Sequence, residues 1–264
     1  MEASQDAAPL IELVGDAPGD AFLRASQAIE TARLLLCDLD GCLILGGAPA
    51  PGAPAFVARH SAKIRLVSNN STLTPDLCSR RLGQIGVHVA PDHIHLAGAA
   101  GLQQIAQDHP QARIMLIGSR ALRVQARRLG LQVVQEEPDV IFLAKDLSLR
   151  FEDLPPIAAA GFAGARLIVA NTDPSRPIAA DRLEPETGVQ LQALRTFAPG
   201  LAFDVVGKPW PMLFEQALAA AGVGAGEAVM IGDTLATDVA GAGSLGITTI
   251  LVDSSRTPWR RLCP

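Results

Sequence analysis

Short, continuous runs of apolar residues recur along this chain and alternate with segments of helical periodicity. The runs are rich in Leu, Ile and Val, have the length of single strands, and cover residues 34–37, 64–67, 114–117, 140–143, 167–170, 203–206, 228–231 and 247–252. The helical segments cover residues 54–60, 75–85, 120–129, 189–197, 211–220 and 235–244. Strands that are apolar throughout and joined by helices predict an α/β fold with a mostly parallel sheet covered on both faces.

Composition narrows the class of protein. The 264 residues are 48% hydrophobic and 19% charged, which predicts a sizeable buried core in one or two domains. A net charge of -5 and an aromatic content of 4%, with no Tyr, argue against a surface that binds nucleic acid or an anionic membrane.

The N-terminal segment 1–20 is acidic and has no long apolar stretch, so it does not read as a signal or transit peptide. No window approaches the ~18 consecutive apolar residues of a transmembrane helix. We therefore expect a cytoplasmic protein whose scattered cysteines stay reduced; they are Cys37, Cys42, Cys78 and Cys263.

Two carboxylates follow the first apolar run. Asp38 and Asp40 come directly after residues 34–37, and strand alternation turns both side chains the same way. Gly41 then permits a sharp turn. Two acids this close repel each other unless a cation or a shared proton compensates them. Because ligands bind at the carboxyl ends of parallel strands, this pair is the first candidate for chemistry.

The second apolar run ends in a polar loop. Ser68, Asn69 and Asn70 follow it, and Thr74 with Pro75 predicts the start of a helix directly after the loop. Hydroxyl and backbone N–H donors near a helix N-terminus suit a phosphate. Taken alone, the segment also fits an ordinary polar loop.

Two later runs end in charged residues. Lys208 follows residues 203–206 and Gly207, a position where a solvated lysine is the simplest interpretation. Asp233 follows residues 228–231, and Asp238 falls in the first turn of the next helix, where an acid also suits the helix dipole.

In chain order these motifs are DxDGxL from Asp38, a serine at a strand end, Gly-Lys-Pro around Lys208, and GDxxxxD ending at Asp238. This order resembles the haloacid dehalogenase (HAD) superfamily of phosphatases and phosphotransferases. The Ser-Asn-Asn-Ser loop from Ser68 is similar to the T-N-N-S loop of subfamily IIA, which contains the NagD-type nucleotide phosphatases, the 4-nitrophenyl phosphatases and pyridoxal phosphatase.

The resemblance implies a Rossmann-like parallel-sheet core with an inserted α/β cap of the C2 type. Within the cap, the stretch from Asn171 to Pro177 resembles the T-N-x-D-x-x-x-P loop by which such caps select substrates. The N-terminal thirty residues lie outside the resemblance and receive no function. The expected ranges are 1–88 with 203–264 for the core, including 1–30 as an extension, and 89–202 for the cap.

The resemblance also implies a mechanism. Asp38 would attack phosphorus, and Asp40 would protonate the leaving group and then activate water, while Ser68 and Lys208 would bind the phosphoryl group. The implied cofactor is Mg²⁺, since the clustered carboxylates would otherwise repel a phosphate; its implied ligands are Asp38, the Asp40 backbone carbonyl, Asp233 and Asp238. The implied substrate-binding residues are Ser68, Asn69, Asn70, Asn171, Asp173, Arg176 and Lys208.

The expected partner is a small phosphorylated metabolite of open identity, and neither nucleic acid nor a membrane is expected. A phosphotransferase of the same superfamily and a non-catalytic ligand-binding relative are the alternatives. The second is disfavoured because the nucleophile, the acid and the lysine are all present. A homodimer through the cap stays open, since relatives often pair there.

Other residues have two interpretations each. His93 and His95 fall in the expected cap. We expect them at a surface strand edge rather than in a metal site. Trp210, directly after Lys208 and Pro209, would wall the substrate pocket or cover the core. Arg176 would pair with an anionic substrate group or stay solvated.

Overall fold

The computed structural model describes residues 8–14, 18–179, 182–254 and 258–262. Packing divides the chain into two compact units. The first contains the chain up to Ser68, the segment Ser79–His95 and the chain from Lys208 onward; the second contains Asn69–Cys78 and Leu96–Gly207. These units differ from the expected ranges in residues 69–78, 89–95 and 203–207. The expected ranges remain a prediction of independently folding domains.

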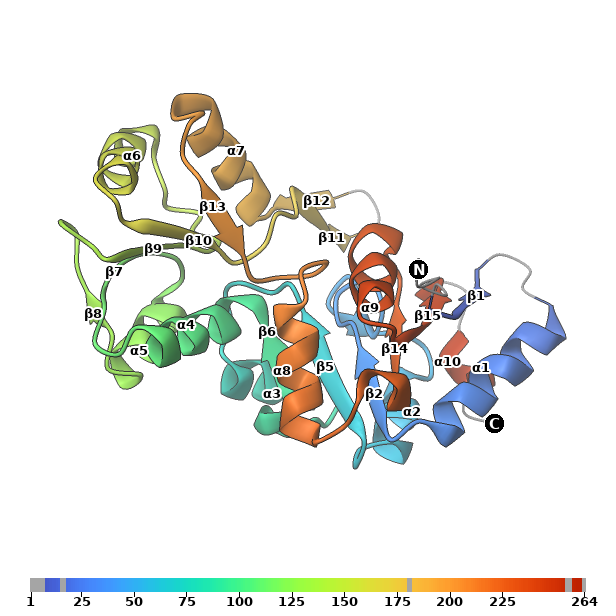
Figure 1. Cartoon of the computed structure of the whole chain (residues 1–264). Coiled ribbons are helices and arrows are strands. Elements are labelled where there is room, and N and C mark those ends of the chain that lie inside the picture. Colours follow the sequence, from blue (N-terminus) through green and yellow to red (C-terminus); the bar gives the residue numbers. More distant parts are fainter. Residues whose placement is uncertain (1–7, 15–17, 180–181, 255–257, 263–264) are drawn as a thin grey trace, which may run out of the picture. The chain divides into compact units, whose positions relative to one another are not determined.

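The first unit is built on a six-stranded sheet in the order β1-β15-β14-β2-β5-β6 (Figure 1). The pairs β1/β15, β15/β14, β14/β2 and β2/β5 are all parallel. Strands β2 and β14 are buried at every position, as continuous apolar runs predict. The bounds are β1 Leu10–Leu13, β2 Leu34–Cys37, β5 Ile64–Ser68, β6 Ile94–Leu96, β14 Ala228–Gly232 and β15 Thr248–Val252.

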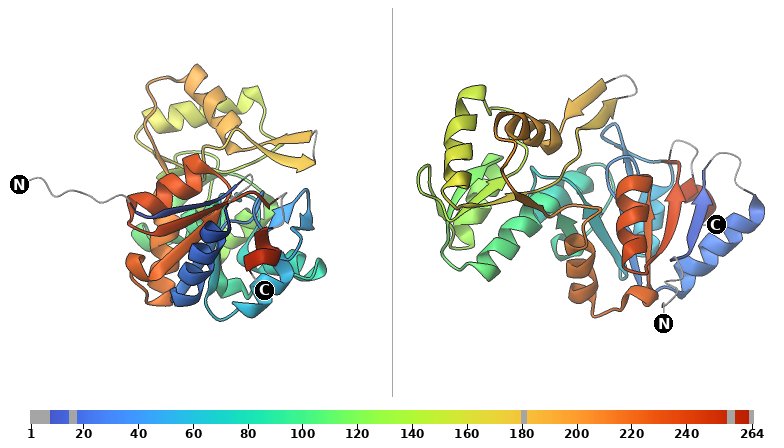
Figure 2. Two further views of the ribbon diagram at one scale, coloured as in Figure 1. Left: turned by 90° about the vertical axis from the view of Figure 1, so that its right-hand side faces the viewer. Right: turned by 45° about the horizontal axis from the view of Figure 1, so that its top comes forward.

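Helices cover both faces of this sheet. Because α9 leads outward from β14 to β15 whereas α2 leads from β2 toward β5, right-handed crossovers put these two helices on opposite faces (Figure 2). The helices are α1 Gly19–Thr31, α2 Ala53–Arg59, α3 Pro75–Gln84, α8 Met212–Ala221, α9 Ala240–Ser244 and α10 Pro258–Leu262. Shorter elements are the hairpin β3 Ile44–Leu45 with β4 Ala48–Pro49, the 3-10 turns η1 Pro91–His93 and η3 Ala225–Glu227, and the π-helical turn η4 Leu235–Val239.

The register of the sheet determines which residues share its carboxyl edge. Cys37 lies opposite Ile231 on β14 and opposite Leu66 on β5. The three chain segments that follow these positions therefore leave the sheet at one edge. They begin with Asp38, with Gly232 and Asp233, and with Val67 and Ser68.

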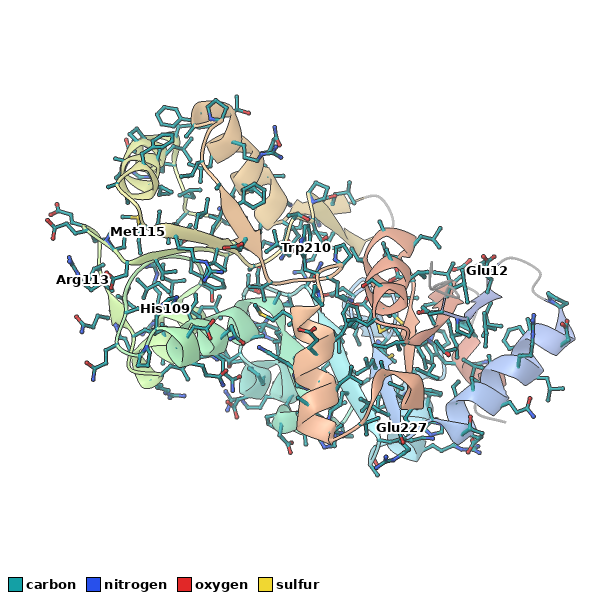
Figure 3. All side chains as sticks on the ribbon, viewed as in Figure 1. Glu12, His109, Arg113, Met115, Trp210 and Glu227 are labelled. Carbon is teal, nitrogen blue, oxygen red and sulfur yellow. The ribbon has the colours of Figure 1, made fainter. Side chains whose placement is uncertain are left out.

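The N-terminal extension is part of this fold. β1 forms the edge of the sheet beside β15, and its alternating burial leaves Glu12 (labelled in Figure 3) exposed. Helix α1 buries Ala21, Ala25 and Ile29. The extension thus completes the core, a role that its sparse apolar pattern did not indicate.

The second unit is built on a five-stranded parallel sheet in the order β13-β10-β9-β7-β8. Ile157 of α6 and Leu194 of α7 belong to the apolar cluster on one face, together with Met115 of β7 (labelled in Figure 3). Helices α4 and α5 lie on the other face (Figure 1). The strands are β7 Arg113–Ile117, β8 Gln132–Val133, β9 Val140–Leu143, β10 Arg166–Val169 and β13 Phe203–Val205, with the antiparallel hairpin β11 Ser175–Ala179 and β12 Arg182–Pro185. The helices are α4 Ala97–Asp108, α5 Arg120–Arg128, the 3-10 turn η2 Phe151–Asp153, α6 Leu154–Phe162 and α7 Thr187–Phe197.

His93 and His95 lie in the first unit, which corrects their expected place in the inserted cap. They occupy η1 and β6, at the edge of the core sheet. Arg65 Nη1 lies 2.8 Å from His93 Nδ1. Within the described residues, neither histidine belongs to a group of three or more potential metal ligands. The strand-edge interpretation therefore describes them best.

Cys37, Cys42 and Cys78 are buried and form no disulfide with another described residue, whereas Cys263 lies outside the described residues. Across the described parts of the chain, every helix is too short or too polar to cross a membrane.

Candidate active site

Lys208 lies between two carboxylates at the carboxyl edge of the core sheet. Its Nζ is 2.5 Å from Oδ1 of Asp38 and 2.6 Å from Oδ1 of Asp238. The three residues are only 2%, 6% and 1% exposed, respectively. Ionised groups this deep are stable only when each has a partner, so the lysine and the two carboxylates depend on one another.

A third carboxylate converges on the same place. One oxygen from each of Asp38, Asp233 and Asp238 lies within 4.8 Å of the others. Carboxylate oxygens are the ligands that Mg²⁺ prefers, so this donor set fits a hard divalent cation. The three side chains that the sequence assigned to the metal are thus brought together, and the Asp40 carbonyl stays a predicted fourth ligand.

The electrostatics of the cluster leave an excess of negative charge. Burial raises the pKa of Asp38, and Lys208 offsets part of that rise. Burial, followed by the charges of Asp38 and Asp238, raises the pKa of Asp233 to about 7. Burial likewise raises the pKa of Asp238 to about 6. Burial lowers the pKa of Lys208, but Asp238 and Asp38 outweigh it and hold this pKa above its usual value. Three carboxylates exceed one lysine, and a divalent cation would compensate the remainder.

Two glycines leave room for the carboxylates. A Cβ on Gly232, at the end of β14, would overlap the Asp238 carboxylate, and a Cβ on Gly41 would meet Oδ2 of Asp233. Gly41 also has φ of 90°, which side chains rarely adopt. Asp238 lies in the π-helical turn η4, where its Oδ2 accepts the Thr234 backbone N–H at 3.1 Å. Such turns are frequent at functional sites.

The other predicted catalytic residues flank this cluster. Asp40 lies in the loop after β2, is partly exposed and forms a β-bridge with Ile44. Ser68 is the last residue of β5 and is 2% exposed. Trp210 (labelled in Figure 3) is 39% exposed and so covers the core only in part. Their roles toward a substrate stay predictions.

The predicted substrate residues of the second unit bind one another. Asn171 is fully buried, and its Nδ2 donates to the backbone carbonyl of Asn69 at 2.7 Å. Asn69 Nδ2 donates to Asp173 Oδ2 at 3.0 Å, and Asn70 Oδ1 accepts the Thr72 backbone N–H at 3.1 Å. These bonds tie the segment after β5 to the loop after β10, so the residues have a structural role beside any role in binding.

Arg176 is paired within its own unit. Its Nη2 lies 2.8 Å from Glu184 Oε2, and its Nε lies 3.1 Å from Glu186 Oε1. Lys145, which is 5% exposed, reaches the same two carboxylates at 2.6 and 2.9 Å. Arg176 is therefore not simply a solvated loop arginine. Sequence reasoning missed Lys145, although a lysine just after the buried strand β9 is the same signal that singled out Lys208.

The site thus places three carboxylates and a buried lysine at the carboxyl edge of a parallel sheet, where α/β proteins bind their ligands. Residues 35–132 match the family described as haloacid dehalogenase-like hydrolase, and residues 205–261 match a second HAD-like hydrolase family. The chain is 31% identical over 222 residues to D-glycerol 3-phosphate phosphatase of Mycobacterium tuberculosis, covering 83% of this chain and 62% of that protein. It is 30% identical to dihydroxyacetone phosphatase of Corynebacterium glutamicum, covering 83% and 80%.

The solved structures agree with these matches. The magnesium complex of glycerol phosphate phosphatase from Mycobacterium tuberculosis aligns with a TM-score of 0.78 at 29% identity, covering 86% of this chain and 69% of that one. The chain belongs to the haloacid dehalogenase-like hydrolase family. Its relatives include small-molecule phosphatases of the 4-nitrophenylphosphatase type. The family and fold class inferred from the sequence are thereby confirmed.

Proposed function

We propose that this chain is a phosphatase that hydrolyses small phosphomonoesters through a phosphorylated Asp38, with Mg²⁺ as its cofactor. The observation that carries the proposal is the position of Lys208, in contact with both Asp38 and Asp238 and beside the carboxylate of Asp233. A nucleophile, a fixed positive charge and a set of oxygen ligands in one buried place are what covalent phosphoryl transfer requires.

In the first half-reaction, a carboxylate oxygen of Asp38 attacks phosphorus and the bond to the ester oxygen breaks, which gives an acyl phosphate. The leaving alkoxide takes a proton from Asp40. Lys208 holds the Asp38 carboxylate in place, and the Ser68 hydroxyl donates to a phosphoryl oxygen. Bound Mg²⁺, which Asp38, Asp233 and Asp238 would hold, supplies further positive charge at the phosphoryl group.

In the second half-reaction, Asp40 is a carboxylate and takes a proton from water. The water oxygen attacks phosphorus, the bond between phosphorus and Asp38 breaks, and inorganic phosphate leaves. This step restores the Asp38 carboxylate and the Asp40 proton, so the cycle closes without another reactant.

The substrate is a small phosphorylated metabolite. D-glycerol 3-phosphate and dihydroxyacetone phosphate are the first candidates, because two relatives are named for glycerol 3-phosphate and for dihydroxyacetone. A cytoplasmic location, the absence of nucleic-acid and membrane partners, and a homodimer through the cap remain predictions from the sequence.

The test is phosphate release from 4-nitrophenyl phosphate and from glycerol 3-phosphate, with Mg²⁺ and with EDTA. The wild type should turn over only with Mg²⁺, and Asp38→Asn should lose all turnover. Asp40→Asn should lose about 100-fold or more on glycerol 3-phosphate but less on 4-nitrophenyl phosphate, whose leaving group needs little protonation. Full activity of Asp38→Asn would refute the covalent route. A folded wild type that releases no phosphate would refute the proposed phosphatase activity.

A further inference from the structure

The C-terminal helix α10 places an indole beside the loop that follows the nucleophile. Trp259 is fully buried, and its Nε1 donates to the backbone carbonyl of Cys42 at 3.2 Å. Cys42 is itself fully buried and lies two residues after Asp40. A buried carbonyl is costly to leave without a donor, so this bond fixes the backbone at that point.

The loop that receives this bond is a closed turn. The Gly41 N–H donates to the Ile44 carbonyl at 2.8 Å, and the Ile44 N–H donates to the Leu39 carbonyl at 2.9 Å. Asp40 lies inside the turn, between Leu39 and Gly41. The indole of Trp259 therefore bonds to the same short turn that carries Asp40.

Contacts of the indole and of its helix neighbours hold α10 in place. Its ring centroid lies 4.8 Å from that of Phe56 on α2. A Cβ on Gly52, which has φ of 95°, would come within 2.8 Å of the Arg260 backbone nitrogen, so the helix backbone lies directly against the start of α2. The Arg261 guanidinium lies 3.4 Å above the ring of Phe22 on α1. The N-terminal extension and the C-terminal helix thus pack together beside the turn, with α10 next to α2 (Figure 2).

We propose that Trp259 is a positioning residue for Asp40, acting through its hydrogen bond to the Cys42 carbonyl. The inference rests on the proposed function, because it gives Asp40 the proton transfer described above. Without the bond, the Asp40 turn samples more orientations, and protonation of the leaving group slows while substrate binding is unaffected.

The test is Trp259→Phe, which keeps a buried aromatic ring and removes the N–H donor. We expect kcat on glycerol 3-phosphate to fall about 3- to 10-fold with KM unchanged, and kcat on 4-nitrophenyl phosphate to change less than 2-fold. In an Asp40→Asn background the same substitution should have no further effect. Phe56→Leu is the matched control, since it loosens the packing of the Trp259 ring but keeps its N–H. It should lower Tm without changing the ratio of kcat on glycerol 3-phosphate to kcat on 4-nitrophenyl phosphate.

Trp259 only stabilises the fold if Trp259→Phe lowers kcat equally on both esters, or equally in the wild-type and Asp40→Asn backgrounds. Either result would overturn the inference. If Trp259→Phe does not fold, the exposed Arg261→Ala takes its place: it releases α10 from Phe22 and should lower the same ratio by a smaller factor, and an unchanged ratio refutes the inference. An inactive wild type refutes the proposed function as well. If kcat on glycerol 3-phosphate falls in Asp40→Asn but not in Trp259→Phe or Arg261→Ala, only the role of Trp259 is refuted.

Discussion

Lys208 provides the sharpest test of the site. Methionine at this position keeps most of the side-chain volume and removes the charge that faces Asp38 and Asp238. Both carboxylates are more than nine-tenths buried, so they have little access to water as an alternative partner. Removing one member of a buried ion pair typically costs about 3–5 kcal/mol. At about 2–4 °C per kcal/mol for a chain of this size, Lys208→Met should lower Tm by roughly 6–20 °C.

The measurement is thermal unfolding in EDTA at pH 8, followed by kcat on 4-nitrophenyl phosphate with saturating Mg²⁺. Loss of a fixed charge at the phosphoryl group should lower kcat by about 100-fold or more. Lys145→Met is the matched control, because Lys145 is also buried and also lies between two carboxylates, Glu184 and Glu186. It should lose less stability than Lys208→Met, because Arg176 still pairs with both glutamates, and it should lose far less activity. A Lys208→Met variant as stable as the wild type in EDTA, or equal kcat losses in the two variants, would refute this account of the cluster.

Two further predictions concern acid stability and the space around the metal ligands. Burial lowers the pKa of His95 to about 4, so the unfolded chain binds more protons than the folded one between pH 4 and 6.5. The free energy of unfolding should therefore fall as the pH drops through that window, by about 3 kcal/mol more in the wild type than in His95→Leu. Urea unfolding at pH 7 to 4 measures it, and an equal fall in the two proteins would contradict this. Gly232→Ala should raise the Mg²⁺ concentration needed for half-maximal activity about tenfold or more, because the new Cβ displaces Asp238 and overpacks the site by about 1–3 kcal/mol. Gly243→Ala, whose Cβ meets nothing within 4 Å, is its control, and equal behaviour of the two would count against a steric requirement at Gly232.

Local pattern was sufficient for the core of the fold. Strands 34–37 and 140–143 were predicted with the observed bounds, because a strand buried on both faces is apolar at every position. Helix α3 begins at Pro75, and the Thr74 hydroxyl accepts the Leu77 N–H at 3.4 Å, as its capping sequence predicted. The elements that were missed carry weaker patterns. β1 alternates because it is an edge strand, and α10 is too short to show a period.

The sequence by itself determined which residues stand at strand ends, since both periodicity and the following polar residue are local properties. That was enough to select Asp38, Ser68, Lys208 and Asp233 as one candidate site. It could not determine partners, because a partner is chosen by packing between segments far apart in the chain. Only the tertiary structure decided that Lys208 is shared by Asp38 and Asp238, 170 and 30 residues away.

The same limit explains the other residues. The sequence left Arg176 open between a partner of an anionic substrate group and a solvated loop residue, and the hairpin of β11 and β12 brings Glu184 and Glu186 to it. Trp259 belongs to no motif, and only the packing of α10 against α2 and α1 brings its indole to the Cys42 carbonyl. The sequence gives the chemistry of each side chain directly. The distance between two side chains depends on how the whole unit packs, and no local segment determines that packing.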